Sequence, residues 1–240
     1  MMNKIKRAVI MAAGKGERLR PVTLSVPKPM IKVNNRRIID TVIDGLVEND
    51  IKDIFIVTGY LKEKFCELKE KYPFVTLIEN RLFDSCNNIS SLYAARGLLE
   101  ENVMIIDGDQ IINDASVLRP DLERSGYAAA WTEEHTNEWL MTLSGNIVTG
   151  CSRSGGRNGW QLYGISRWTK EDAAKLKRHV EYEFDIKQNR NVYWDDIAMF
   201  IHSAEYELGI CEISKNAVKE IDTLAELAAA DPSYLKYVKI

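Results

Sequence analysis

Short buried strands alternate with helices along the first half of the chain. The strands are apolar runs, and the helices carry apolar residues at helical spacing. Strand segments are expected at 7–13, 53–58, 75–78 and 103–106, and helical segments at 38–48, 61–71 and 89–100. This spacing is typical of βα units and predicts an α/β, Rossmann-like fold with a mostly parallel central sheet flanked by helices. Ligands of such sheets bind at the carboxyl ends of the strands.

The second half of the sequence is less regular. Short strands are expected at 127–131, 140–143, 160–165 and 207–213, and helices at 169–180, at 196–202 and from Thr223 onward. We expect a single domain, 1–240, with a small substrate lobe whose elements lie mainly within 127–205. The glycine-rich stretch 152–159 is expected to be a mobile loop over the site.

The overall charge limits the classes of ligand. The net charge is −3, so non-specific binding to nucleic acid is not expected, and any phosphate site must come from a local cluster of Lys and Arg. The four cysteines are widely spaced and form no C-x-x-C pair, which indicates reduced thiols. No apolar stretch is long enough for a membrane span. We therefore expect a cytoplasmic protein with neither a membrane nor a nucleic-acid partner, and the oligomeric state stays open.

A glycine- and arginine-rich loop follows the first strand. Its glycines, Gly14 and Gly16, let the backbone approach a phosphate, and Lys15, Arg18 and Lys28 supply positive charge. The P-loop pattern is absent, and Leu19 stands where a dinucleotide fingerprint needs its third glycine. These parts are suited to holding a triphosphate.

The complete string is more specific than its glycines. Residues 12–28 match A-A-G-x-G-x-R-L-x-P-x-T-x-x-x-P-K, and the chain therefore resembles the sugar-phosphate nucleotidylyltransferase superfamily. The resemblance implies the nucleotidyltransferase fold and a loop that wraps the triphosphate of the nucleotide. It also implies that Arg18 and Lys28 stabilise charge on the phosphates during in-line attack at the α-phosphorus, a catalytic role that suits phosphoryl-type transfer. The nucleotide-binding residues of this loop are then Ala12, Ala13, Gly14, Lys15 and Gly16.

Asp107-Gly108-Asp109 directly follows the apolar strand at 103–106. Carboxylates at a strand end are typical Mg²⁺ ligands, because Mg²⁺ prefers oxygen. The resemblance implies two metal-binding aspartates, for which Asp109 and Asp222 are the best matches, and one Mg²⁺ that bridges the α-phosphate and the incoming phosphate oxygen. Asp107 is assigned to the nucleotide site, and which of Asp107 and Asp109 is the main metal ligand stays open.

Aromatic residues lie beside carboxylates at two places in the second half. Glu138-Trp139 is one, and Tyr193-Trp194-Asp195 is the other. Aromatic faces with nearby carboxylates recognise quaternary ammonium groups, so we expect these five residues to bind a cationic phosphate. The alternative is that the aromatic residues are core, the commoner fate of a single Trp.

A closer resemblance covers nearly the whole chain. The chain is similar to bacterial CTP:phosphocholine cytidylyltransferases at 59–63, 87–93, 136–139, 193–195 and 220–222. This resemblance implies CTP and phosphocholine as partners, CDP-choline and pyrophosphate as products, and Asn88 and Ser90 beside the nucleotide. Asp107-Gly108-Asp109-Gln110 departs from the family's Asp-Ala-Asp-Asn, and residues 155–159 are richer in glycine than the family pattern.

Three other functions are compatible with the sequence. A 2-aminoethylphosphonate cytidylyltransferase would need a less aromatic and more hydrogen-bonding acceptor site. A sugar-1-phosphate nucleotidylyltransferase would need polar, hydroxyl-binding side chains. A non-catalytic nucleotide sensor should lack Lys28, Arg18 or a metal aspartate, whereas all of these are present. The paired histidines of eukaryotic choline cytidylyltransferases are absent, since His135, His179 and His202 lie far apart in sequence.

Overall fold

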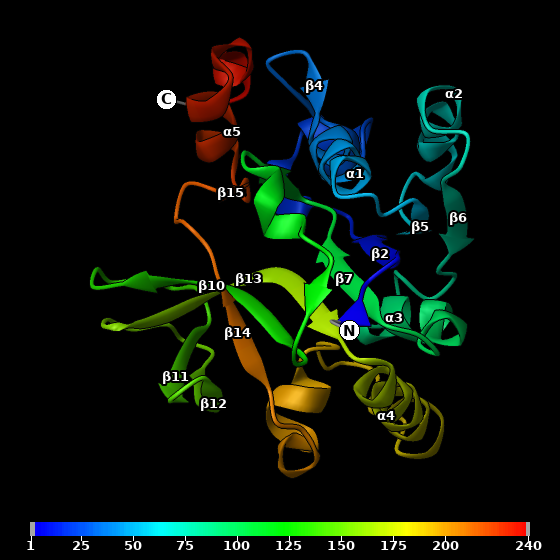
Figure 1. The fold of residues 1–240 in the computed structure, drawn as a ribbon. Helices are drawn as coiled ribbons and strands as arrows, with labels where there is room; N and C mark the ends of the chain where they lie inside the picture. Colours follow the sequence, from blue (N-terminus) through cyan, green and yellow to red (C-terminus); the bar gives the residue numbers. More distant parts are fainter. Residues whose placement is uncertain (1–2, 239–240) are drawn as a thin grey trace.

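A mixed nine-stranded sheet with helices on both faces forms the centre of the computed structural model, which describes residues 3–238 (Figure 1). Its strand order is β10-β14-β12-β11-β13-β7-β2-β5-β6, and three two-stranded pairs, β1–β9, β3–β4 and β8–β15, lie outside it. The nine strands are β2 (Arg7–Ala12), β5 (Asp53–Thr58), β6 (Thr76–Glu79), β7 (Val103–Asp107), β10 (Gly126–Thr132), β11 (Leu140–Ser144), β12 (Ile147–Ser152), β13 (Gly159–Trp168) and β14 (Gly209–Glu212). The paired strands are β1 (Asn3–Lys4), β3 (Lys32–Val33), β4 (Arg36–Arg37), β8 (Gln110–Ile112), β9 (Asp121–Leu122) and β15 (Val218–Glu220).

The first half of the sheet is parallel, and helices cover both of its faces. Strand β2 pairs in parallel with β5 and β7, and β5 pairs in parallel with β6. Alternate β2 residues point to opposite faces: Ile10 packs in the core cluster that holds helix α1, and Val9 packs in the cluster that holds α3 and α4. The helices are α1 (Ile38–Glu48), α2 (Leu68–Lys71), α3 (Ile89–Ala95), α4 (Lys170–Glu181) and α5 (Leu224–Ala230). The α/β nucleotidyltransferase-type fold class expected from the sequence is confirmed, but the sheet is mixed instead of mostly parallel, because the antiparallel lobe continues it.

The carboxyl ends of the parallel strands lie at one edge of this sheet. Residue pairing aligns Met11 with Asp107 and Ala12 with Thr58. The loop after β2 therefore begins beside the aspartates that end β7. This alignment positions the candidate site.

Strand β13 joins the parallel half to an antiparallel lobe. Along one edge of β13, residues 165–168 pair with β7 and residues 160–161 pair with β11. Strand β10 pairs along the opposite edge of β13. Neighbouring strands are therefore parallel from β6 to β7. Beyond β7 the pairings are antiparallel, except that β10 pairs in parallel with β14. Figure 1 shows the lobe strands β10–β12 and β14 on one side of the molecule and α2 on the other.

The less regular half differs in detail from the expectation. Strand β12 was not expected. The stretch 152–159, expected to be a mobile loop, is held by an isolated β-bridge between Thr136 and Gly156. The segment expected as a helix at 196–202 is a short π-helical turn, Ile197–Ile201. The helices expected from Thr169 and Thr223 are each capped by that threonine, whose side chain accepts a bond from the third backbone N–H of α4 and α5, respectively.

Within residues 3–238, none of the helices has the length and apolar character needed to cross a bilayer. The assignment of residues 1–240 to one domain stays a prediction, and its first and last two residues lie outside the described range.

Candidate active site

The glycine loop turns sharply at Gly16. Its φ of +60° lies in the left-handed region, and a Cβ there would meet Thr23 Cγ2 at 3.0 Å and Lys28 Cβ at 3.1 Å. The Thr23 hydroxyl donates to the Gly16 carbonyl oxygen at 2.9 Å, which ties the loop to the segment that follows. Glycine at this position therefore brings the loop backbone directly against Lys28.

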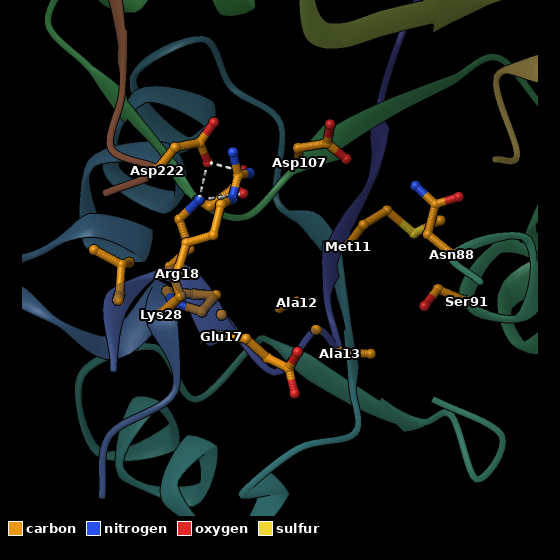
Figure 2. A pocket seen from close by; sticks show the side chains of 15 residues that line it. Met11, Ala12, Ala13, Glu17, Arg18, Lys28, Asn88, Ser91, Asp107 and Asp222 are labelled. Carbon is orange, nitrogen blue, oxygen red and sulfur yellow. Dashed lines mark hydrogen bonds and ion pairs between the residues drawn. The ribbon is translucent and has the colours of Figure 1, made fainter. Parts of the chain in front are cut away.

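The ammonium of Lys28 lies between the two aspartates predicted to bind metal. Its Nζ donates to Asp109 Oδ2 at 2.8 Å and to Asp222 Oδ1 at 2.7 Å, and Arg18 Nη2 approaches the same Asp222 oxygen at 3.0 Å (Figure 2). Burial alone would lower the pKa of Lys28, but the two carboxylates outweigh it and raise the pKa. Likewise burial would raise the pKa of Asp222, while Lys28 and Arg18 hold it below its ordinary value. Lys28 and Asp222 are therefore both charged at neutral pH.

A cavity of about 460 Å³ opens at the carboxyl ends of β2 and β7. Figure 2 shows Arg18, Lys28 and Asp222 on one side of it and Asn88 and Ser91 on the other. Its walls combine backbone and small side chains of the glycine loop with charged groups, a lining suited to a nucleotide with its phosphates. The lining residues are Met11, Ala12, Ala13, Gly14, Gly16, Glu17, Arg18, Leu19, Lys28, Pro29, Asn88, Ser91, Asp107, Asp109 and Asp222.

Two expected nucleotide residues do not line this cavity. The hydroxyl of Ser90 is buried, donating to the Asn87 carbonyl oxygen and accepting from Asn80, and its neighbour Ser91 faces the cavity instead. Lys15 forms an ion pair with Asp84 and is not among the residues that line the cavity. Both placements have a local cause: the first turn of α3 turns Ser90 inward, and the carboxylate of Asp84 holds Lys15.

A second cavity of about 290 Å³ adjoins the first. Five residues line both: Arg18, Asn88, Asp107, Asp109 and Asp222. The remaining walls come from the antiparallel lobe and the C-terminal strand β15: Glu138, Trp139, Leu162, Gly164, Tyr193, Asp195 and Glu220. The two cavities therefore meet at the predicted metal ligands.

Two aromatic rings form a corner of the second cavity. The rings of Trp139 and Tyr193 are 6.0 Å apart at 88° to each other, and Tyr193 is 48% exposed. Trp194, expected to contact substrate, is only 2% exposed and packs in the core against Tyr127 and Trp168. Trp194 therefore lies outside the second cavity, whereas its neighbours Tyr193 and Asp195 line it.

Carboxyl groups crowd the second cavity and oppose one another's ionisation. Burial raises the pKa of Asp195 to about 7, and burial together with Asp109 raises that of Glu220 to about 8. Burial, with Asp109, Asp195 and Glu220 nearby, places the pKa of Asp107 well above its ordinary value. Burial, with a contribution from Asp222, also raises the pKa of Glu138. Such a cavity attracts a cation, since bound positive charge would relieve this repulsion.

Comparison with known proteins agrees with this geometry. Residues 7–124 match the family described as nucleotidyl transferase. A 2-aminoethylphosphonate cytidylyltransferase from Lancefieldella rimae is 39% identical over 95% of this chain and 93% of its own length. A choline-phosphate cytidylyltransferase from Streptococcus pneumoniae is 34% identical over 92% of this chain and 94% of its own length. The chain belongs to the nucleotidyl transferase family.

Solved structures place this nucleotidyltransferase in the same fold. The structure of a CTP:phosphocholine cytidylyltransferase from Streptococcus pneumoniae matches with a TM-score of 0.87 and 33% identity, covering 96% of this chain and 99% of that one. An inositol-1-phosphate CTP transferase from T. maritima matches over the full length of both chains with a TM-score of 0.75 at 16% identity, which supports the fold alone.

Sequence reasoning missed several residues of this nucleotidyltransferase site. Glu220 belongs to the stretch 220–222 that carries the family resemblance, and its position at the end of strand β15, two residues before Asp222, is the signal that could have found it. Gly164 packs against Asp107, where a Cβ would lie 2.2 Å from Oδ2. A single glycine inside a strand pattern can signal such a close approach.

Proposed function

We propose that the protein transfers CMP from CTP to phosphocholine, giving CDP-choline and pyrophosphate. The observation that carries the proposal is the boundary between the two cavities, where Arg18, Asp109 and Asp222 face both sides. A nucleotide in the larger cavity and a small phosphate in the smaller one would meet at this boundary. Approach from opposite sides is the arrangement that in-line displacement requires.

The proposed reaction needs alignment and charge neutralisation. An acceptor phosphate oxygen forms a bond to the α-phosphorus of CTP, the bond from that phosphorus to the bridging oxygen breaks, and pyrophosphate leaves with its electron pair. Lys28, buried in the nucleotide cavity with its charge maintained by two carboxylates, is suited to stabilising the developing negative charge. Arg18, whose side chain is largely exposed, is placed to contact phosphates entering from solvent.

The carboxylates at the boundary suit a magnesium ion. Asp109 and Asp222 direct one oxygen each toward a single point, the Lys28 ammonium, so both already lie around one positive charge. Mg²⁺ takes oxygen ligands and is commonly held by one or two carboxylates together with substrate phosphates. When bound here, it would neutralise phosphate charge during the transfer. We propose Asp109 and Asp222 as its protein ligands.

The second cavity, called the acceptor cavity from here on, has a lining that suits a cationic head group. Trp139 and Tyr193 offer two ring surfaces, and Glu138 and Asp195 line the same space. A quaternary ammonium is stabilised by aromatic faces and by nearby negative charge, without hydrogen bonds. These features, with the likeness to the phosphocholine enzymes, support phosphocholine as acceptor.

A second candidate acceptor is 2-aminoethylphosphonate. The core position of Trp194 leaves two rings in the cavity, whereas six carboxyl groups line it: Asp107, Asp109, Glu138, Asp195, Glu220 and Asp222. Carboxylates that accept hydrogen bonds favour a primary ammonium over a quaternary one. The relative from Lancefieldella rimae bears the name of that activity.

Pyrophosphate release with Mg²⁺ and CTP tests the proposal. Phosphocholine, 2-aminoethylphosphonate and glucose-1-phosphate would be offered separately, and kcat/KM compared. We expect the largest kcat/KM for phosphocholine. A larger value for 2-aminoethylphosphonate would transfer the assignment to the second candidate, and turnover of the sugar phosphate alone would contradict a cationic acceptor site. Omitting Mg²⁺, or replacing Asp222 by Asn, should abolish most of the release.

A further inference from the structure

Two of the three histidines meet at the end of α4, although they are far apart in sequence. The His179 and His202 rings stack with centroids 3.9 Å apart and planes within 5°. The carboxylate of Glu205 faces both: its Oε1 is 3.3 Å from His179 Nε2 and 3.6 Å from His202 Nδ1. One ligand atom from each of these three residues lies within 4.8 Å of the other two.

The remaining ring nitrogens already have partners. His179 Nδ1 lies 2.8 Å from the Tyr206 hydroxyl, and His202 Nε2 lies 3.1 Å from Glu183 Oε1. The Glu183 side chain is only 7% exposed, so its contact with His202 is enclosed. A histidine that ligates a metal usually bonds through its other ring nitrogen to a carboxylate or another polar group, which orients the ring. Both histidines have that second partner here.

We propose that His179, His202 and Glu205 bind a divalent transition-metal ion of the zinc class, at a site separate from the catalytic one. Two imidazoles and one carboxylate are a common ligand set for Zn²⁺, with water in the fourth position. Ligand atoms about 2.0–2.1 Å from zinc in a tetrahedron lie roughly 3.3 Å apart. The observed distances from Glu205 to the two ring nitrogens, 3.3 and 3.6 Å, are close to that separation.

Binding requires a small rearrangement of the two rings. The nitrogen lone pairs of the two stacked rings lie in nearly parallel planes, whereas a shared ion needs the lone pairs to converge on one point. Each ring must therefore turn about its χ2 angle, which is a soft torsion for histidine. Glu205 has a 54% exposed side chain, so it can follow the ion without disturbing the core.

The position of the site connects it to the acceptor cavity. His179 lies in the last turn of α4, and His202 directly follows the π-helical turn Ile197–Ile201. The chain between them carries Tyr193 and Asp195, which line the acceptor cavity. An ion held by both histidines would cross-link the two ends of this segment. The metal site itself does not depend on the identity of the acceptor.

Calorimetric titration with Zn²⁺, performed in excess Mg²⁺ to occupy the catalytic carboxylates, tests the proposal. We expect one Zn²⁺ per chain with micromolar or tighter affinity, weakened at least tenfold by His179→Gln or by Glu205→Gln. Co²⁺ in place of Zn²⁺ should give the intense visible absorption of a tetrahedral site. The matched control is His135→Gln, which removes the remaining histidine and should leave binding unchanged.

Three results would overturn the proposal. Absence of binding up to about 1 mM Zn²⁺ is one. A second is that the parent protein and the His179→Gln and Glu205→Gln variants bind Zn²⁺ with equal affinity, because the ion would then bind elsewhere. Loss of binding in His135→Gln with retention in the other two variants is the third. Because Glu205 is an exposed residue, its variant should fold normally, and circular dichroism of each variant checks this.

Discussion

The parallel half and the antiparallel lobe contribute to the site in different ways. In the parallel half, the ligand-facing groups come from strand ends and from a loop fixed by Gly16, so the regular sheet determines their positions. In the lobe, Glu138 and Trp139 lie between β10 and β11, and Tyr193 and Asp195 lie in an irregular stretch after α4. The groups proposed to act on the phosphates therefore lie on rigid elements, and the groups proposed to recognise the acceptor lie on segments that can vary without changing the sheet. Relatives of similar overall identity accordingly carry names with different acceptors.

Removal of Lys28 is the strongest test of the rigid half. Lys28→Ala should lower kcat by about 10²–10³-fold, because a buried, pre-positioned positive charge at the developing negative charge is lost. The matched control is Lys62→Ala, which removes an exposed lysine paired with Glu79. Pyrophosphate release measures both variants, and circular dichroism checks the fold. A decrease of less than threefold in kcat, under about 1 kcal/mol of barrier, would remove the assigned role.

Trp194→Ala tests whether this residue supports the lobe from within. Because the indole is buried against Tyr127 and Trp168, we expect the free energy of unfolding to fall by about 3–5 kcal/mol. Urea denaturation followed by circular dichroism would measure the change. If the variant is as stable as the parent and its only defect is a higher KM for the acceptor, Trp194 would instead contact the acceptor in the cavity.

Trp139→Ala makes the complementary change at the cavity surface. Loss of one of two ring faces should raise the KM for the acceptor about tenfold, within the energy range of a desolvated cation–π contact, and leave the KM for CTP nearly unchanged. Steady-state kinetics with each substrate varied in turn separates the two effects. Equal increases in both constants would mean that Trp139 shapes the whole lobe and not the acceptor cavity.

The same contrast explains what could be predicted from sequence. Strand β5 and helix α1 have the bounds expected, because apolar periodicity reports which face of a regular element is buried. Lys28 meets Asp222, 194 residues away, and only the family resemblance linked them. Strand β12 was missed because none of its residues is fully buried and their burial does not alternate along the strand. Nor could periodicity decide between Trp194 and its neighbours, since an irregular segment has none, and the burial of its indole depends on packing with β10 and β13.

The pH dependence of acceptor use should report on Asp195. Its pKa of about 7, raised by burial, means that the carboxylate is mostly neutral at pH 6 and mostly charged at pH 8. We compare kcat/KM for the acceptor in the parent protein and in Asp195→Asn. If the Asp195 carboxylate attracts a cationic acceptor, the ratio of parent to variant should rise by up to about tenfold from pH 6 to pH 8. A ratio that stays constant with pH would exclude Asp195 from acceptor binding.

The stability of the same variant gives an independent check on this pKa. A folded-state pKa above the unfolded value means that the folded protein binds the proton more tightly, so the stabilisation is present at low pH and is lost as pH rises from about 4 to 7. Asp195→Asn, which is always neutral, should therefore gain about 4 kcal/mol relative to the parent between pH 4 and pH 8, because the shift is about three pKa units. Urea midpoints at the two pH values measure the gain. An unchanged difference would mean that Asp195 is well solvated.

The smallest expected effect distinguishes two adjacent serines. Ser91 lines the nucleotide cavity and accepts a bond from Asn80 at 3.0 Å, so its own hydrogen is available to a nucleotide oxygen. Ser90 both accepts from Asn80 and donates to the Asn87 carbonyl oxygen, and its hydroxyl is fully engaged in the loop. Ser91→Ala should raise the KM for CTP about threefold or more, the effect of one neutral hydrogen bond, whereas Ser90→Ala should lower stability by about 1 kcal/mol and leave that KM unchanged. The reverse pattern would show that α3 turns its first residues differently when nucleotide binds, and would restore Ser90 to the nucleotide site.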